Sequence, residues 1–554
     1  MTIVERVDPQ LAIAPRDPDV VMRMSRMGSA HPMRLSFLRV LLRRLQAEGW
    51  RFDRPVWDID DRGVGRAVYR ARGPVRTYCL VAFAHDLPDE MRSDRVIATS
   101  WDATFALVDG EPSGADLDRL AANVPLQEAG RLTARELSLS RANRSVRLFS
   151  HVVGRLAEGR QPDLAEIEAV GYLMRTTAVY GSGKFGAADR DEIADRPELK
   201  APFQAEMLSV WLTRAFTVDI AEHMARVKGG ARAVPLDRDL RRRLGVGNST
   251  GLGMAPFLVR HPRLLNSWMT VRETALARVR SLSAADPAAL EGFHRALAEA
   301  TGNARLWQSE HPAQVAKLTR LRADLSALAD HVRSGWDHGA MQPWDALWRW
   351  GDAHLSEEGH ECLLSLLLEP QGALIDDLAD ALDADEWSGF AIDGSLSVAV
   401  FRERLAFDYA WVDRFDFTDP AQVARFWYVS EEKLEPRLGN RHDEAGQDRE
   451  QPLGIARAIA DLSAALASGD QGETLAAFLL RQPGHRHTVR RVQMMRGLPY
   501  AEIRDNVLDQ GMLPIDILRC KLAFFGATRF DPRSDLWVRI SLFQDQPFPD
   551  EVTK

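Results

Sequence analysis

Cysteine is scarce in this chain of 554 residues, which holds only Cys79, Cys362 and Cys520. An odd, widely spaced set cannot form a disulfide framework, and no two of these cysteines have the spacing of a zinc knuckle or a redox motif. Each one lies in an apolar stretch, which is the usual setting of inert, buried thiols. We therefore expect three unpaired structural thiols, as in a cytoplasmic protein.

Long apolar runs and an excess of positive charge are also missing. One of the longest apolar runs, residues 362–368, is far too short to cross a bilayer. The first residues carry acids and prolines early, unlike a secretory signal. The 71 Lys and Arg residues are outnumbered by 79 Asp and Glu, which gives a net charge of −8 and disfavours a general nucleic-acid binder. The composition predicts a cytoplasmic protein with no membrane or nucleic-acid partner, and it leaves the oligomeric state open.

Familiar catalytic and metal-binding motifs are absent. The chain has no GxSxG nucleophile elbow and no zincin pattern. A di-iron bundle needs two Glu-x-x-His motifs, which are not present either. His360 and Glu361 are adjacent, so on a helix they point to different faces. We therefore predict no metal site, and the sequence indicates neither a cofactor nor catalytic residues.

The periodicity of apolar residues indicates the fold class. At 554 residues the chain exceeds what one hydrophobic core usually supports. Strand-like patterns occupy about 64–110, helical spacing dominates from about 115 to 385, and strand-like patches return at 395–430 and 535–543. We predict a mainly α protein of the α+β class, in which a large helical body carries a small antiparallel sheet near the N-terminus and minor later strands.

The same pattern suggests three regions. We expect an N-terminal helix plus the small sheet over 1–130, a helical body with glycine-rich loops over 131–385, and a C-terminal α+β region over 386–554. Apolar spacings of three and four predict individual helices over 33–49, 203–227, 262–283, 285–300, 313–335 and 356–368.

One glycine-rich segment, GSGKFG at 181–186, resembles a phosphate-binding loop. It departs from the P-loop pattern, because Ala178 stands where the first glycine belongs and Phe185 replaces the magnesium-binding Ser or Thr. Its backbone could still approach an anion, with Lys184 completing the site. The alternative is a helix terminus with a solvated lysine.

A second segment, GVGNSTGLG at 245–253, surrounds Asn248, Ser249 and Thr250 with glycines. Backbone N–H groups at the start of a following helix, together with these three side chains, would form an anion cradle. The spacing does not match the dinucleotide-binding pattern. The alternative is a capped turn between two helices.

Arginines recur at intervals of three in residues 138–151, at Arg141, Arg144 and Arg147. On a helix, Arg144 and Arg147 would share a face with His151. Such arginines could clamp a carboxylate or phosphate, or form a solvated, ion-paired surface.

Together these segments predict one anion-binding pocket within residues 138–253, formed by Arg144, Arg147, Lys184, Asn248, Ser249 and Thr250. The leading hypothesis is an enzyme acting on a small carboxylate- or phosphate-bearing substrate, with the reaction undetermined. The alternatives are a helical scaffold, in which the loops are only joints, and a nucleotide-dependent enzyme with a non-standard phosphate loop.

Overall fold

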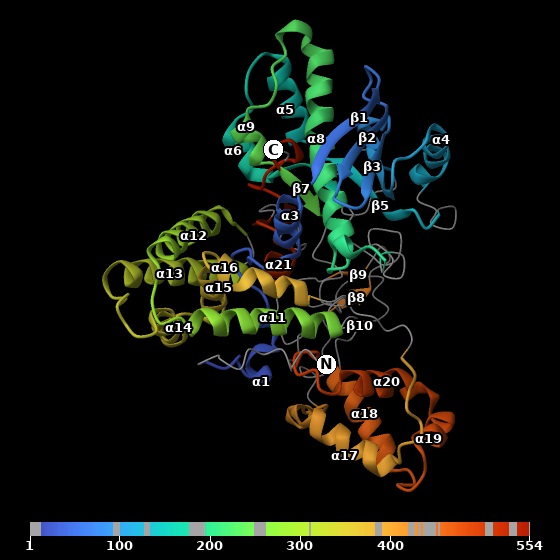
Figure 1. The fold of residues 1–554 in the computed structure, drawn as a ribbon, viewed down its shortest axis with the longest axis vertical. Helices are drawn as coiled ribbons and strands as arrows, with labels where there is room; N and C mark the ends of the chain where they lie inside the picture. Colours follow the sequence, from blue (N-terminus) through green and yellow to red (C-terminus); the bar gives the residue numbers. More distant parts are fainter. Residues whose placement is uncertain are drawn as a thin grey trace.

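A computed structural model shows a nine-stranded mixed sheet and a body of helices that share one continuous hydrophobic core (Figure 1). The structure describes residues 13–91, 100–126, 133–176, 193, 195–248, 262–309, 312–382, 390–418, 427–429, 434–435, 450–451, 455–504, 514–530 and 540–552.

The large sheet has the strand order β1-β2-β3-β4-β5-β6-β7-β12-β11. Its neighbours pair antiparallel except β6 and β7, which run parallel. The strands are β1 (Arg51–Ile59), β2 (Gly65–Arg72), β3 (Thr77–Ala84), β4 (Ala103–Asp109), β5 (Glu136–Arg144), β6 (Tyr172–Thr176), β7 (Gly245–Asn248), β11 (Arg529–Phe530) and β12 (Ile540–Leu542). A separate small sheet joins β8 (Trp427–Val429), β9 (Leu434–Glu435) and β10 (Glu450–Gln451).

The prediction of a small N-terminal sheet is wrong. Strands β2, β3 and β4 lie within the predicted 64–110, but β5, β6, β7 and the late strands β12 and β11 extend the same sheet. These added strands include some of only two to five residues, which is too short for a periodicity window to detect. Their pairing joins segments far apart in the chain, so no local sequence pattern indicates it.

Two different layers cover the large sheet. The helix α8 (Gln204–Gly229) lies against one face, where the ring of Phe216 meets the edge of Phe105 on β4 at 5.4 Å. The other face carries the short helix α4 (Gly114–Asn123), whose Leu117 and Leu120 complete a second apolar cluster with β3 and β4. Because α8 packs against the sheet and against α3 and α5, it is buried on nearly every side and lacks a distinct polar face.

The remaining helices form the body and the chain ends. They are α1 (Pro18–Val21), α2 (Met24–Met27), α3 (Phe37–Ala47), α5 (Leu148–Ala157), α6 (Leu164–Val170), α9 (Arg238–Arg242), α11 (Pro262–Arg280), α12 (Pro287–Leu306), α13 (Pro312–Ser334), α14 (Pro343–His354), α15 (Glu357–Leu368), α16 (Gly372–Ile375), α17 (Val398–Asp408), α18 (Ile455–Ala467), α19 (Leu475–Arg481), α20 (Arg486–Met495), α21 (Pro514–Phe525) and α22 (Pro549–Val552). No helix in the described ranges is both long and apolar enough to span a bilayer.

All six predicted helices are confirmed, as α3, α8, α11, α12, α13 and α15. The strand-like patch at 395–430 is largely wrong, because α17 occupies its first part and only β8 near its end is a strand. The closing strand predicted at 535–543 is confirmed in part as β12. Helices α17 to α20 have a small core of their own, at the end of the molecule away from the large sheet (Figure 1).

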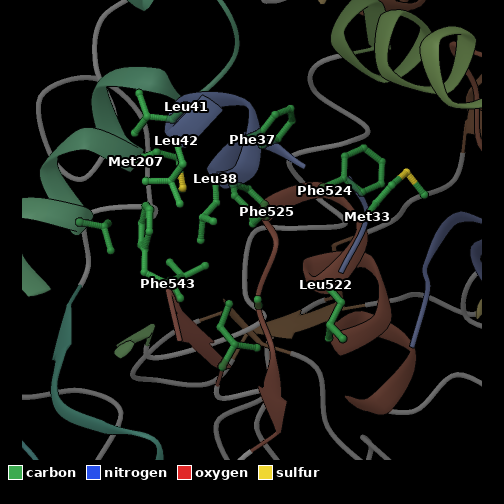
Figure 2. Packing of buried hydrophobic residues seen from close by; sticks show 14 of the residues in the cluster. Met33, Phe37, Leu38, Leu41, Leu42, Met207, Leu522, Phe524, Phe525 and Phe543 are labelled. Carbon is green, nitrogen blue, oxygen red and sulfur yellow. The ribbon is translucent and has the colours of Figure 1, made fainter. Parts of the chain in front are cut away.

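Helix α21 joins the N-terminal and central parts of the chain. Figure 2 shows Phe525 of α21 beside Phe37 and Leu38 of α3, with Met207 of α8 nearby. The rings of Phe37 and Phe525 meet edge to face at 5.3 Å. Such aromatic contacts bury large apolar areas, so α21 is held firmly where it approaches the end of the sheet.

A buried ion cluster anchors the described N-terminal segment to the helical body. Arg16 donates to Glu273 at 2.8 Å and to Glu361 at 2.7 Å, and both carboxylates are almost fully buried. Arg272 is 2.7 Å from Glu273 and 3.8 Å from Glu361, and Arg26 is 3.4 Å from Glu361. We refer to Arg16, Arg26, Arg272, Glu273 and Glu361 as the buried ion cluster.

The three cysteines are free and buried, which confirms the expectation of unpaired thiols. Burial raises the pKa of each thiol to about 12. At neutral pH almost no reactive thiolate forms, so we expect a thiol reagent such as iodoacetamide to label the native protein very slowly. Mass spectrometry should show three labels only after denaturation. Rapid labelling of the native protein would contradict the assignment.

Candidate functional site

The carboxyl ends of β6 and β7 lie side by side, because these strands are parallel neighbours. Their last residues, Thr176 and Asn248, pair directly with each other. Each strand leads straight into one of the glycine-rich segments identified in the sequence. Residues 177–192 follow Thr176 and residues 249–261 follow Asn248, and both segments lie outside the described residues. Two stretches that are far apart in the sequence thus start from one edge of the sheet.

Two arginines approach this edge from the face of the sheet that α4 covers. Arg175 is the penultimate residue of β6 and is only 6% exposed. Ala142 of β5 pairs with Thr176, so Arg141 lies one residue beyond the last residue of β6, towards the carboxyl edge. The guanidinium of Arg141 stacks on Trp101 at 3.8 Å. Alternation along the strands places Arg141 and Arg175 on the same face.

Gly247 makes room for one of these arginines. It pairs with Arg175 across β6 and β7, and a Cβ at residue 247 would lie 2.8 Å from Arg175 Cγ and from Tyr172 Cδ2. A larger residue would therefore force the arginine stem or the tyrosine ring to shift. The glycine has a packing role in the strand, which differs from the loop role that the sequence suggested.

Lys521 of α21 reaches the same edge from the opposite face. Its ammonium nitrogen lies 3.4 Å from Oδ1 of Asn248 and 5.1 Å from the centre of the Phe525 ring. The residue is 2% exposed, and burial lowers the pKa of its amine to about 7. We call Arg141, Arg175, Thr176, Asn248 and Lys521 the strand-edge site.

The predicted pair Arg144 and Arg147 lies in the other direction along β5. Arg144 pairs with Met174, two residues before the end of β6, and its Nε is 3.6 Å from Asp102. Arg147 is largely exposed and forms an ion pair with Glu166 at 2.6 Å. The predicted helical face is wrong for Arg144, because Glu136–Arg144 is a strand and helix α5 begins only at Leu148. The alternation in ELSLS was the overlooked period-two signal.

Of the other predicted residues, only Asn248 is described. Lys184, Ser249 and Thr250 lie outside the described residues. Asn248 ends a buried strand, whereas the alternative interpretation of this segment, a capped turn, placed it between two helices. Lys521 was missed, although a single lysine within the apolar run LRCKLAFF was a usable signal.

A large open cleft of about 1470 Å³ lies elsewhere, between α12 and the segment 369–374. Arginines line it, but most are already neutralised: Arg34 donates to Asp376 at 2.8 Å and Arg243 to Asp545 at 3.1 Å. Arg39 forms an ion pair with Glu369 in the same way. Acids and bases are thus interleaved along the walls of this cleft.

In the part of the chain that the structure describes, no three His, Cys, Asp or Glu side chains come close enough to hold a metal ion. The strand-edge site therefore rests on arginine, lysine and amide groups, which recognise anions and carbonyl oxygens. A comparison of the chain with protein-family models, curated proteins and solved structures finds no match.

Proposed function

We propose that the protein is an enzyme acting on a small anionic substrate, bearing a carboxylate or phosphate, that binds at the strand-edge site. The pairing of Thr176 with Asn248 carries this proposal, because both glycine-rich segments follow directly from these residues. Ligands of sheets with parallel strands bind outside the carboxyl ends of those strands. Backbone N–H groups of glycine-rich segments are common anion donors.

The charge at this edge supports an anionic ligand. Arg141 and Arg175 share one face, and guanidinium groups bind carboxylates and phosphates through two parallel hydrogen bonds. Lys521 and Asn248 approach from the other face. In this proposal Arg141 and Arg175 replace Arg144 and Arg147 as the arginines that bind the anion.

We also propose that the protein acts in the cytoplasm. Its three thiols are free and buried, a pattern typical of a reducing compartment.

A matched pair of arginine variants tests the anion site. Arg141→Met keeps most of the apolar stem over Trp101 but removes the charge, and we expect it to weaken binding of phosphate or pyruvate by about 1.5–3 kcal/mol, the scale of a charged hydrogen bond. Isothermal titration calorimetry gives the affinity. Thermal melting with and without each anion checks it, because a ligand of the native state raises the melting temperature.

Arg147→Met is the control, since Arg147 lies in the same stretch but is exposed and paired with Glu166. It should bind both anions as the unmodified protein does. If Arg147→Met loses as much anion affinity as Arg141→Met, the anion site includes Arg147 and the assignment of the site to Arg141 is contradicted. If the unmodified protein binds neither anion, the enzyme proposal fails and the scaffold hypothesis becomes the better one.

A further inference from the structure

Lys521 is unusual among the lysines of the described chain because its amine is buried without a carboxylate partner among the described residues. Lys317, on a helix near α21, donates to both carboxylate oxygens of Asp516 at 2.8 and 2.9 Å. Lys521 is more deeply buried, yet no carboxylate of the described residues forms an ion pair with it. Its polar contact there is the amide oxygen of Asn248 at 3.4 Å.

A buried ammonium group without a counter-charge is unfavourable, so such a group gives up its proton. The lowered pKa of Lys521, about 7, reflects this burial. A neutral amine has a free electron pair and is a nucleophile towards carbonyl carbon, which an ammonium ion is not. An apolar side chain would fit the same surroundings at less cost, so a lysine here points to chemistry rather than to stability.

Asn248 supplies a second group that such chemistry needs. Its Oδ1 accepts from Lys521, which orients the amide so that Nδ2 points elsewhere. That Nδ2 is buried and has no hydrogen-bond partner among the described residues. A buried, unpaired donor costs free energy, and an oxygen of a ligand would satisfy it. The amine and the amide donor therefore lie together at the carboxyl ends of β6 and β7, on the face of the sheet opposite to Arg141 and Arg175.

We propose that Lys521 forms an imine with the carbonyl carbon of a small 2-oxo acid that binds beside Asn248 at the carboxyl ends of β6 and β7. This inference rests on the proposed function and names its substrate class. The amine nitrogen adds to the carbonyl carbon, and the oxygen develops charge that Asn248 Nδ2 stabilises by a hydrogen bond. The carbon–oxygen bond then breaks, the two amine hydrogens leave with the oxygen as water, and a carbon–nitrogen double bond remains. No oxidant or reductant takes part.

Reductive trapping tests this directly. The full-length protein is incubated with pyruvate or glyoxylate and sodium cyanoborohydride, which reduces an imine to a stable secondary amine. We expect a mass increase of one reduced adduct, mapped by peptide mass spectrometry to Lys521. Lys521→Met keeps most of the side-chain stem but has no amine, so it cannot form the imine and should give no adduct. Lys317 serves as an internal control and should stay unmodified.

The outcomes separate this inference from the proposed function. If pyruvate binds in an Arg141-dependent way but no adduct forms at Lys521, the imine is excluded and the anion site stands. Adducts spread over several exposed lysines, with no preference for Lys521, likewise overturn the inference. If Lys521 is trapped equally well in Arg141→Met and phosphate does not compete, the amine is reactive but the anion site fails.

Discussion

Glu361→Gln is expected to lower the free energy of unfolding by about 3–5 kcal/mol, the cost of breaking a buried ion pair by removing one partner. Glu361 is almost completely buried and accepts two hydrogen bonds from Arg16, at 2.7 and 3.2 Å. The amide keeps the shape of the side chain but removes its charge. Arg16 and Arg272 would then share the single remaining carboxylate of Glu273. Urea denaturation at neutral pH, followed by circular dichroism, measures the change.

Glu357 offers a matched control on the same helix, one turn earlier. It lies 3.4 Å from Arg26, but its side chain is 43% exposed, so solvent screens the pair. Glu357→Gln should change the free energy of unfolding by less than about 1 kcal/mol. Similar losses in both variants would show that the buried ion cluster does not stabilise the fold beyond a surface ion pair.

The effect of Glu361→Gln on the free energy of unfolding should also depend on pH, in a direction that the pKa of Glu361 determines. Burial alone would raise the pKa of Glu361, but Arg16 and Arg272 hold it at about 2, below its ordinary value of 4.5. A carboxylate with a depressed folded-state pKa stabilises the protein fully above its unfolded pKa and loses that contribution as pH falls through the folded value. The difference between the unmodified protein and Glu361→Gln should be constant near neutral pH and shrink below about pH 4.5.

Lys521→Met is expected to act in the opposite direction and raise the free energy of unfolding by about 1–4 kcal/mol, as apolar replacements of buried charges often do. Methionine has nearly the same length and fits the apolar contacts around Phe525. Burial lowers the pKa of this amine to about 7, against 10.5 in the unfolded chain. Between about pH 7 and 10.5 unfolding therefore takes up a proton, which favours the unfolded state.

The stabilisation should consequently be greatest near neutral pH and decrease as pH rises from 7 towards 10.5. Lys317→Met is the control, because it removes a lysine that pairs with the buried Asp516. It should destabilise the protein by about 1–3 kcal/mol, because the buried Asp516 loses the two hydrogen bonds that Lys317 donates. Thermal and urea unfolding of both variants give the comparison. A loss of stability in Lys521→Met would contradict an uncompensated buried amine.

Local periodicity was enough to locate the long helices from α3 to α15. A helix such as α3 or α13 places its buried apolar residues at intervals of three and four that the sequence itself displays, because its hydrogen bonds join residues four apart. The same holds for β2 and β3, which are long enough to alternate and lie close in the chain. The apolar surroundings of Cys79, Cys362 and Cys520 also indicated their burial directly.

The extent of the sheet could not be obtained in this way. Strands β6 and β7 have five and four residues, and helix α8 lies between them in the sequence. Their pairing depends on α8 packing across the sheet, which is a long-range event. The location of the candidate site depends on this pairing in the same way. Arg144 and Arg147 lie in one arginine-rich stretch with Arg141, and only the register of β5 against β6 shows which arginine lies at the carboxyl edge.

The sequence by itself determined the mainly helical α+β character, the positions of the long helices and the presence of two glycine-rich segments, because these depend on residues near one another in the chain. The tertiary structure decided that both segments leave one edge of a nine-stranded sheet. It also decided that burial lowers the pKa of Lys521 while Lys317 is paired with Asp516, since the pKa of a buried group depends on which distant groups surround it.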